Sequence, residues 1–190
     1  MGLTNTINTY GFVSKFFHWI MALMLIAAWI MGLFHDDVGS LKRTFIIAHY
    51  TLGISVFLLV GFRLAWRLLN PTPTHVLKNK MLNIISNTTF AFFYSLMFLV
   101  PASGYMMMNF RGRNSVFFGY EIPTLFQNNQ SLKELATETH ELLTTLLLVL
   151  VILHVAAALF HHFIRKDPTP KRMLLSKQSS SILIMHFMHT

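Results

Sequence analysis

The sequence contains no cysteine and few charged residues: seven are acidic, and Asp, Glu, Lys and Arg together make up 12% of the chain. Without cysteine the chain cannot form a disulfide, a thiolate nucleophile, a cysteine-ligated zinc site or a protein-held iron–sulfur cluster. With so few charges, it lacks the polar surface that a water-soluble domain of 190 residues needs. Ten histidines and twelve methionines remain as soft metal ligands.

Apolar residues dominate what is present, at 54% of the chain, with a mean hydropathy of +0.53. Four apolar stretches each approach the roughly 20 residues that a helix needs to cross a bilayer. In hydrocarbon, a helix satisfies its backbone amides locally. We therefore predict an all-α integral membrane four-helix bundle, with helices over about 16–34, 44–69, 88–110 and 140–165.

The connections define the order of these helices. A polar turn at 36–40 makes the first two adjacent and antiparallel, Pro71 and Pro73 end the second, and residues 111–138 leave room for a small lid. Lys and Arg are more frequent on the side that would hold both termini, which predicts up-down-up-down topology with cytoplasmic termini. Residues 1–175 would form one domain, and the Ser-rich tail 176–190 is predicted to be loose.

The net charge of +8 is that of many nucleic-acid-binding proteins. Here, however, the basic residues lie between apolar segments and form no stripe interleaved with aromatics. Membrane topology and anionic lipid explain them better, so we expect a lipid membrane as partner and no nucleic acid. The first apolar stretch begins after Lys15 and has no small-residue cleavage site, which favours a retained helix over a signal peptide.

Four histidines fall within or at the ends of the predicted spans. His140 and His154 are 14 residues apart, roughly 21 Å of helical rise and nearly a whole number of turns, so they face one side at two depths. By depth, His49 pairs with His140 near the outer face, and His18 pairs with His154 near the inner face. Two stacked bis-histidine hemes need this arrangement, whereas zinc needs three or four ligands at one point. Interhelical hydrogen bonds or a proton relay are the alternatives.

Several cations could accompany such a site. Arg63 lies 14 residues after His49, so it shares that face at the depth of the inner pair. Its guanidinium could bind a heme propionate bidentately, or it could be an anchor that snorkels to the interface; Arg67 and Lys15 are weaker candidates. At the outer face, four cations could bind propionates or steer an anion inward: Lys42, Arg43, Arg111 and Arg113.

Two further histidines, His161 and His162, follow His154 by seven and eight residues, at the inner interface. Beside Arg165 and Lys166, they could receive a quinone head group and exchange its protons. The alternative is that they only anchor the helix at the interface.

Several short motifs combine with these histidines. They are His18-Trp19, Ala48-His49 followed by Gly53, Arg63-Leu64, Pro71-Thr72-Pro73, Pro101 with Gly104, Arg111-Gly112, His140-Glu141, Leu153-His154, His161-His162 and Arg172-Met173-Leu174. With them, the chain resembles the prokaryotic cytochrome b561 family of four-helix diheme membrane cytochromes over about residues 12–173.

The resemblance implies that His18, His49, His140 and His154 are axial ligands of two heme b groups. It also implies a multi-pass protein of the bacterial inner membrane that carries respiratory electrons from an outer, periplasmic donor to ubiquinone. Some similar proteins oxidise superoxide at the outer face. We therefore expect an oxidoreductase of the superoxide:quinone type, or a non-catalytic electron carrier, as a monomer or homodimer.

Two other functions remain open. A cytochrome b subunit could anchor a dehydrogenase or hydrogenase and relay its electrons to quinone. A proton-coupled transporter with histidines along its path is disfavoured, because the four predicted apolar stretches contain almost no Asp or Glu.

Overall fold

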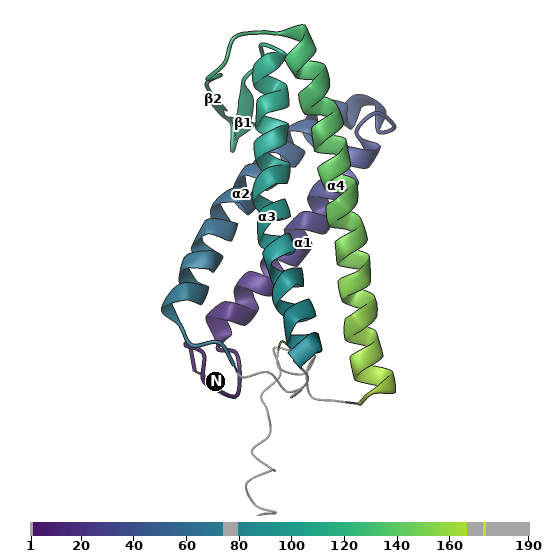
Figure 1. Ribbon diagram of the computed structural model, residues 1–190. Coiled ribbons are helices and arrows are strands. Elements are labelled where there is room, and N and C mark those ends of the chain that lie inside the picture. The colour runs from purple at the N-terminus through teal and green to yellow at the C-terminus, as the bar shows by residue number, and fades with distance from the viewer. Residues whose placement is uncertain (1, 74–79, 167–172, 174–190) are drawn as a thin grey trace, which may run out of the picture.

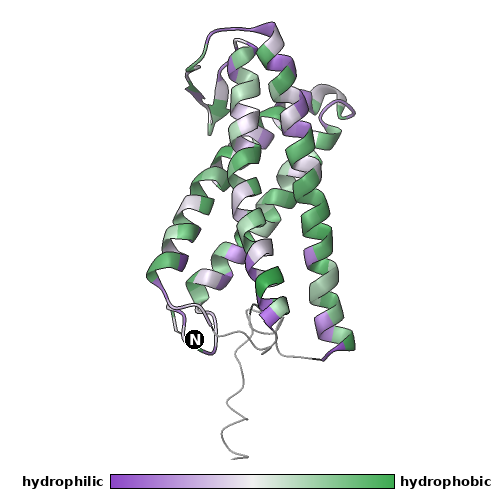
Figure 2. Ribbon diagram, in the orientation of Figure 1, coloured by the Kyte–Doolittle hydropathy of each residue, from purple (hydrophilic) through white to green (hydrophobic). Residues whose placement is uncertain are grey.

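The computed structural model describes residues 2–73, 80–166 and 173. Its main elements are four long helices, α1 (Phe12–Phe34), α2 (Lys42–Leu69), α3 (Lys80–Phe110) and α4 (Gln130–Leu159) (Figure 1). Each contains a window long and apolar enough to cross a membrane, and at most 11% of the residues in any window are buried. Apolar residues cover much of the helices (Figure 2). The predicted four-helix membrane fold is confirmed.

The helices form two pairs. α1 packs against α2 and α3 against α4, and the pairs meet mainly through α2 and α3; among the described residues, α1 and α4 make little direct contact. One end of the bundle holds the N-terminal segment and the end of α4, and we call it the N-terminal end (Figure 1). The opposite hairpin end holds the short helix η1 (Gly39–Leu41) and a hairpin of β1 (Ser115–Phe117) and β2 (Tyr120–Ile122).

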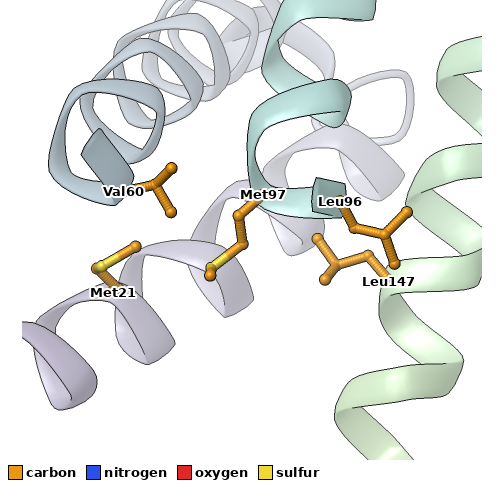
Figure 3. Packing of buried hydrophobic residues seen from close by; sticks show 5 residues of the cluster. All are labelled: Met21, Val60, Leu96, Met97 and Leu147. Carbon is orange, nitrogen blue, oxygen red and sulfur yellow. The ribbon is translucent and has the colours of Figure 1, made fainter. Parts of the chain in front are cut away.

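All four helices contribute to a small buried core (Figure 3). Met21 of α1 and Val60 of α2 are almost inaccessible, and they pack with Leu96 and Met97 of α3 and Leu147 of α4. Leu147 is seven residues from both His140 and His154. The core therefore lies between the two depths at which the histidines were predicted, and close packing there stabilises a bundle that lipid does not drive together.

All four helices begin earlier than predicted, α2 by only two residues, because hydropathy marks where the membrane lies and not where a helix starts. α4 begins at Gln130 instead of 140, since the Asn129 side chain caps it by accepting a hydrogen bond from Leu132 N (3.1 Å). α3 begins at Lys80 instead of 88, and α1 at Phe12 instead of 16. The polar first turns of α3 and α4 extend beyond the apolar windows. The predicted tail, 176–190, lies outside the described residues.

The segment before α1 folds back against the start of this helix. Phe12 N donates to Gly2 O (3.0 Å), and the buried Asn5 side chain accepts from Gly11 N (3.0 Å) and Ser14 Oγ (2.7 Å). A Cβ on residue 11 would lie 2.3 Å from Thr4 O, so only glycine fits. These bonds occupy amides at the start of α1 that would otherwise lack partners.

Candidate functional site

Four histidines project between the helix pairs at two levels. At the hairpin end, the rings of His49 on α2 and His140 on α4 have centroids 6.2 Å apart. At the N-terminal end, the rings of His18 on α1 and His154 on α4 are also 6.2 Å apart. The structure thus brings together each pair that the sequence grouped by depth.

This separation fits two imidazoles that share one metal ion. A ligating imidazole nitrogen lies roughly 2 Å from a first-row transition metal, so two rings on opposite sides of one ion have centroids roughly 6 Å apart. Among the described residues, no third histidine or carboxylate joins either pair to form a metal cluster. Two imidazoles per level match the donor set of a bis-histidine heme better than that of zinc.

Backbone carbonyls orient both rings at the hairpin end. His49 Nδ1 donates to Ala28 O (2.8 Å). His140 Nδ1 lies 3.0 Å from both Val100 O and Ser103 Oγ, and the Ser103 hydroxyl itself donates to Val100 O. These acceptors assign the ring protons to Nδ1 and leave each Nε2 lone pair available to a metal.

Two glycines provide the space for these rings. A Cβ on Gly32 would lie 2.9 Å from His49 Cε1, and one on Gly104 would lie 3.0 Å from His140 Cε1. The sequence motifs included Gly104, beside Pro101, without a role for it at the site, and Gly32 was missed. A small-residue pair four apart, Ala28 and Gly32, is a known signal of close helix approach and could have identified it.

The pair at the N-terminal end is arranged differently. Arg63 Nη2 lies 3.4 Å from His18 Nδ1, and because arginine only donates, the His18 proton belongs on Nε2. To bind a metal through Nε2, His18 would have to move this proton to Nδ1 while Arg63 turned to another acceptor. His154 is exposed and packs edge-on against Phe93, with ring centroids 5.3 Å apart.

One buried polar atom has no partner in the part of the chain that the structure describes. It is Thr144 Oγ1, on the residue four positions after His140, hence on the same face of α4 and one turn closer to the middle of the bundle. Buried hydroxyls almost always have partners. The orphan, the two glycines and the imidazole pairs together fit a bound cofactor with its own polar groups.

Several cations lie at the N-terminal end. Lys15 is only 5% exposed, and Arg63, which lies beside His18, is partly buried and interacts with the Tyr94 hydroxyl. Arg67 stacks over the Phe90 ring at 4.6 Å and is therefore partly committed elsewhere. Arg63 Nη2 is within hydrogen-bond distance of His18, so Arg63 is the cation best placed to bind a carboxylate beside this imidazole.

The predicted steering cations differ in their surroundings. Lys42 pairs with Asp36, which also lies 3.3 Å from the His35 imidazole, so the field of Lys42 is largely cancelled. Arg111 and Arg113 are exposed and lie within electrostatic range of Tyr50, next to His49. Carboxylates nevertheless outnumber cations at this end, so any attraction of anions has to be local.

His161 and His162 lie on a π-helical turn, η2 (Phe160–Ile164), at the end of α4. Their rings contact the neighbouring Phe160 and Phe163. His75, Lys78 and the histidines of the tail lie outside the described residues.

Four membrane helices with imidazoles paired at two depths define a membrane protein of the cytochrome b type. The chain belongs to the prokaryotic cytochrome b561 family, whose sequence profile matches residues 9–176. It is 30% identical over 185 residues to cytochrome b561 homolog 2 of Escherichia coli (strain K12), covering 95% of this chain and 98% of the relative. It is also 29% identical over 163 residues to the probable superoxide oxidase CybB of Yersinia pestis, covering 85% of this chain and 93% of the relative.

Membership of this family implies a b-type heme and electron transfer within a membrane. With four helices able to span the bilayer, the protein is a multi-pass protein of the bacterial inner membrane. The resemblance noted from the sequence motifs is confirmed at the level of the family.

Proposed function

We propose that this protein holds two b-type hemes, one between His49 and His140 and one between His18 and His154. The 6.2 Å separation of the rings within each pair carries this proposal. Arg63 would bind a propionate of the second heme, since its guanidinium lies 3.4 Å from His18 Nδ1. When bound, each heme supplies a reversible one-electron couple at its iron.

The residues determine which chemistry is open to such a centre. If both imidazoles of a pair held an iron, they would leave oxygen no place to bind it, which favours electron transfer over oxygen activation. The hydrogen bonds from His49 to Ala28 O and from His140 to Val100 O hold the rings in one orientation. Fixed ligands need little rearrangement when the charge of the site changes.

We infer that the donor is superoxide and the acceptor is ubiquinone. The reaction would oxidise two superoxide anions to two O₂ and reduce one quinone, which takes up two protons from water, to the hydroquinone. Two observations support superoxide: the exposed Arg111 and Arg113 near the His49 pair, and the name of the Yersinia pestis relative. The hairpin end would face the periplasm, because the cations near the N-terminal end favour the cytoplasm.

Stopped-flow mixing of the oxidised protein with superoxide tests the donor. Neutralising Arg111 and Arg113 together, as R111Q/R113Q, should slow heme reduction by roughly tenfold at low salt and flatten its dependence on ionic strength. Lys133→Gln, at the same end but on α4, is the matched control. Equal rates in the wild type and R111Q/R113Q would refute the steering of superoxide by these arginines. If superoxide does not reduce the wild-type protein, superoxide is not the donor.

A further inference from the structure

A groove of about 470 Å³ runs between α1 and α2 towards the hairpin end. Its α2 wall is a single stripe at helical spacing, and α1 adds two methionines, while Phe118 reaches it from the hairpin. The lining residues are Met24, Met31, Thr44, Ile47, Ala48, Thr51, Leu52, Ser55 and Phe118.

The groove lies at the level of the His49–His140 pair. Ala48 directly precedes His49, and Met31 directly precedes Gly32, whose α-carbon faces the His49 ring. A molecule in the groove beside Ala48 and Met31 would therefore lie at the depth of the His49 imidazole.

The lining selects a neutral, lipophilic occupant. None of the lining side chains is charged, and most are aliphatic or methionine. Thr44, Thr51 and Ser55 also line the groove, but Ser55 Oγ donates to Thr51 O (2.8 Å) within α2, and the surface offered to an occupant is almost wholly apolar. A mostly apolar lining around a volume of several hundred Å³ suits a small lipophilic molecule.

Phe118 covers the groove from the hairpin. It occupies the turn between β1 and β2 with φ +48°, and 71% of its surface is exposed. A left-handed conformation is unfavourable for a phenylalanine. The strand β1 packs against α2, so the hairpin holds this ring at the mouth of the groove.

We propose that the groove is the quinone site, with the ring beside Ala48 under Phe118 and the isoprenoid tail leaving past Leu52 and Met24 into lipid. This rests on the proposed function, in which quinone is the acceptor. The uncharged groove excludes superoxide, and the exposed Arg111 and Arg113 attract it, so the two substrates reach the same histidine pair by separate routes. The two electrons come from superoxide, and the two protons come from water at the hairpin end.

The test compares two alanine-to-phenylalanine variants of the full-length protein in detergent. Ala48→Phe fills the groove, and Ala91→Phe places the same bulk on an exposed face of α3. The protein is reduced with dithionite, freed of reductant, and mixed anaerobically with a short-chain ubiquinone. We expect Ala48→Phe to raise the quinone concentration for half-maximal reoxidation by tenfold or more, with heme content and spectrum unchanged, and Ala91→Phe to match the wild type.

Photolabelling with an azidoquinone gives a second readout that does not depend on folding of a variant. We expect labelled peptides from residues 44–55 or the hairpin around Phe118. Labelling at His161 and His162 instead, or equal reoxidation of the two phenylalanine variants, would refute the groove as the quinone site. Quinone would remain the proposed acceptor. A wild type that no quinone reoxidises would refute the proposed function itself.

Discussion

Gly32 and Gly104 determine how closely α1 and α3 approach the two rings at the hairpin end. Gly32→Ala would place a methyl group 2.9 Å from His49 Cε1, closer than carbon atoms tolerate. We expect the ring to be displaced, so that about one heme per chain is lost or its low-spin absorption bands are altered. Heme content and visible spectra of the purified variant measure this.

Gly61→Ala is the matched control, because a Cβ at this helical position would meet nothing within 4 Å. This change should leave the heme content unchanged and stabilise α2 by up to about 1 kcal/mol, the helical preference of alanine over glycine. If Gly32→Ala has the content and spectrum of the wild type, then His49 is not held where the structure has it.

Asp36 provides a prediction about pH. The hydrogen bond from Lys42 holds the pKa of the Asp36 carboxyl below its ordinary value, with the nearby His35 acting in the same direction. Because the folded pKa is depressed, the pair contributes stability above the ordinary aspartate pKa and loses it as pH falls through the folded pKa. An NMR titration of the carboxyl should show the lowered value, and Lys42→Gln should raise it towards the ordinary value. An unchanged pKa in that variant would contradict the pairing.

Asn109 holds the connection between α3 and α4, residues 111–129, against the end of α3. The side chain is fully buried; its Oδ1 accepts from the backbone amides of Leu125 and Phe126, and its Nδ2 donates to Tyr105 O (2.8 Å). Asn109→Leu keeps the volume but removes the acceptor of two backbone amides, those of Leu125 and Phe126. We expect a loss of about 0.5–1.5 kcal/mol per lost hydrogen bond, and faster hydrogen exchange across 111–129.

Asn114→Ala is the control for this effect, since Asn114 bonds Glu121 (2.8 Å) at an exposed position of the hairpin. Hydrogen exchange of the connection should be close to that of the wild type in this variant. Equal exchange in both variants would mean that Asn109 does not hold the connection.

The helices could be predicted from hydropathy because lipid demands long apolar runs, but their ends could not. With Asn129 as its cap, α4 begins ten residues before its predicted start, in a polar segment that hydropathy cannot assign to a helix. The hairpin strands are three residues each, too short for a periodic pattern. The fold of the N-terminal segment depends on the close approach of Gly11 to the Thr4 carbonyl. No local sequence pattern reveals this contact.

The candidate site was predictable where it depended on helical spacing. His140 and His154 share a face because 14 residues make nearly four turns. Their positions along the predicted spans then paired them by depth with His49 and His18. The Ala28 and Val100 carbonyls could not be inferred, because which backbone atom lies beside a ring depends on helix packing. The ion pair of Lys42 with Asp36 also depended on the fold of a turn.

Because the protein contains no cysteine, single introduced cysteines can test its orientation in the membrane. Asn8→Cys places a thiol at the N-terminal end and Asn114→Cys places one at the hairpin end, both at exposed positions. If the N-terminal end is cytoplasmic, a membrane-impermeant maleimide should label Asn114→Cys in intact spheroplasts and Asn8→Cys only after lysis. The reverse pattern would place Arg111 and Arg113 on the wrong side for a periplasmic anion.

The proposed electron transfer requires that the two imidazole pairs hold two hemes. A pyridine hemochrome assay on purified protein, combined with the protein concentration from amino-acid analysis, measures the number of hemes per chain. We expect two in the wild type, about one in His49→Ala and about one in His154→Ala, with different bands lost in the two variants. A wild-type ratio of one, or two hemes retained in either variant, would contradict it.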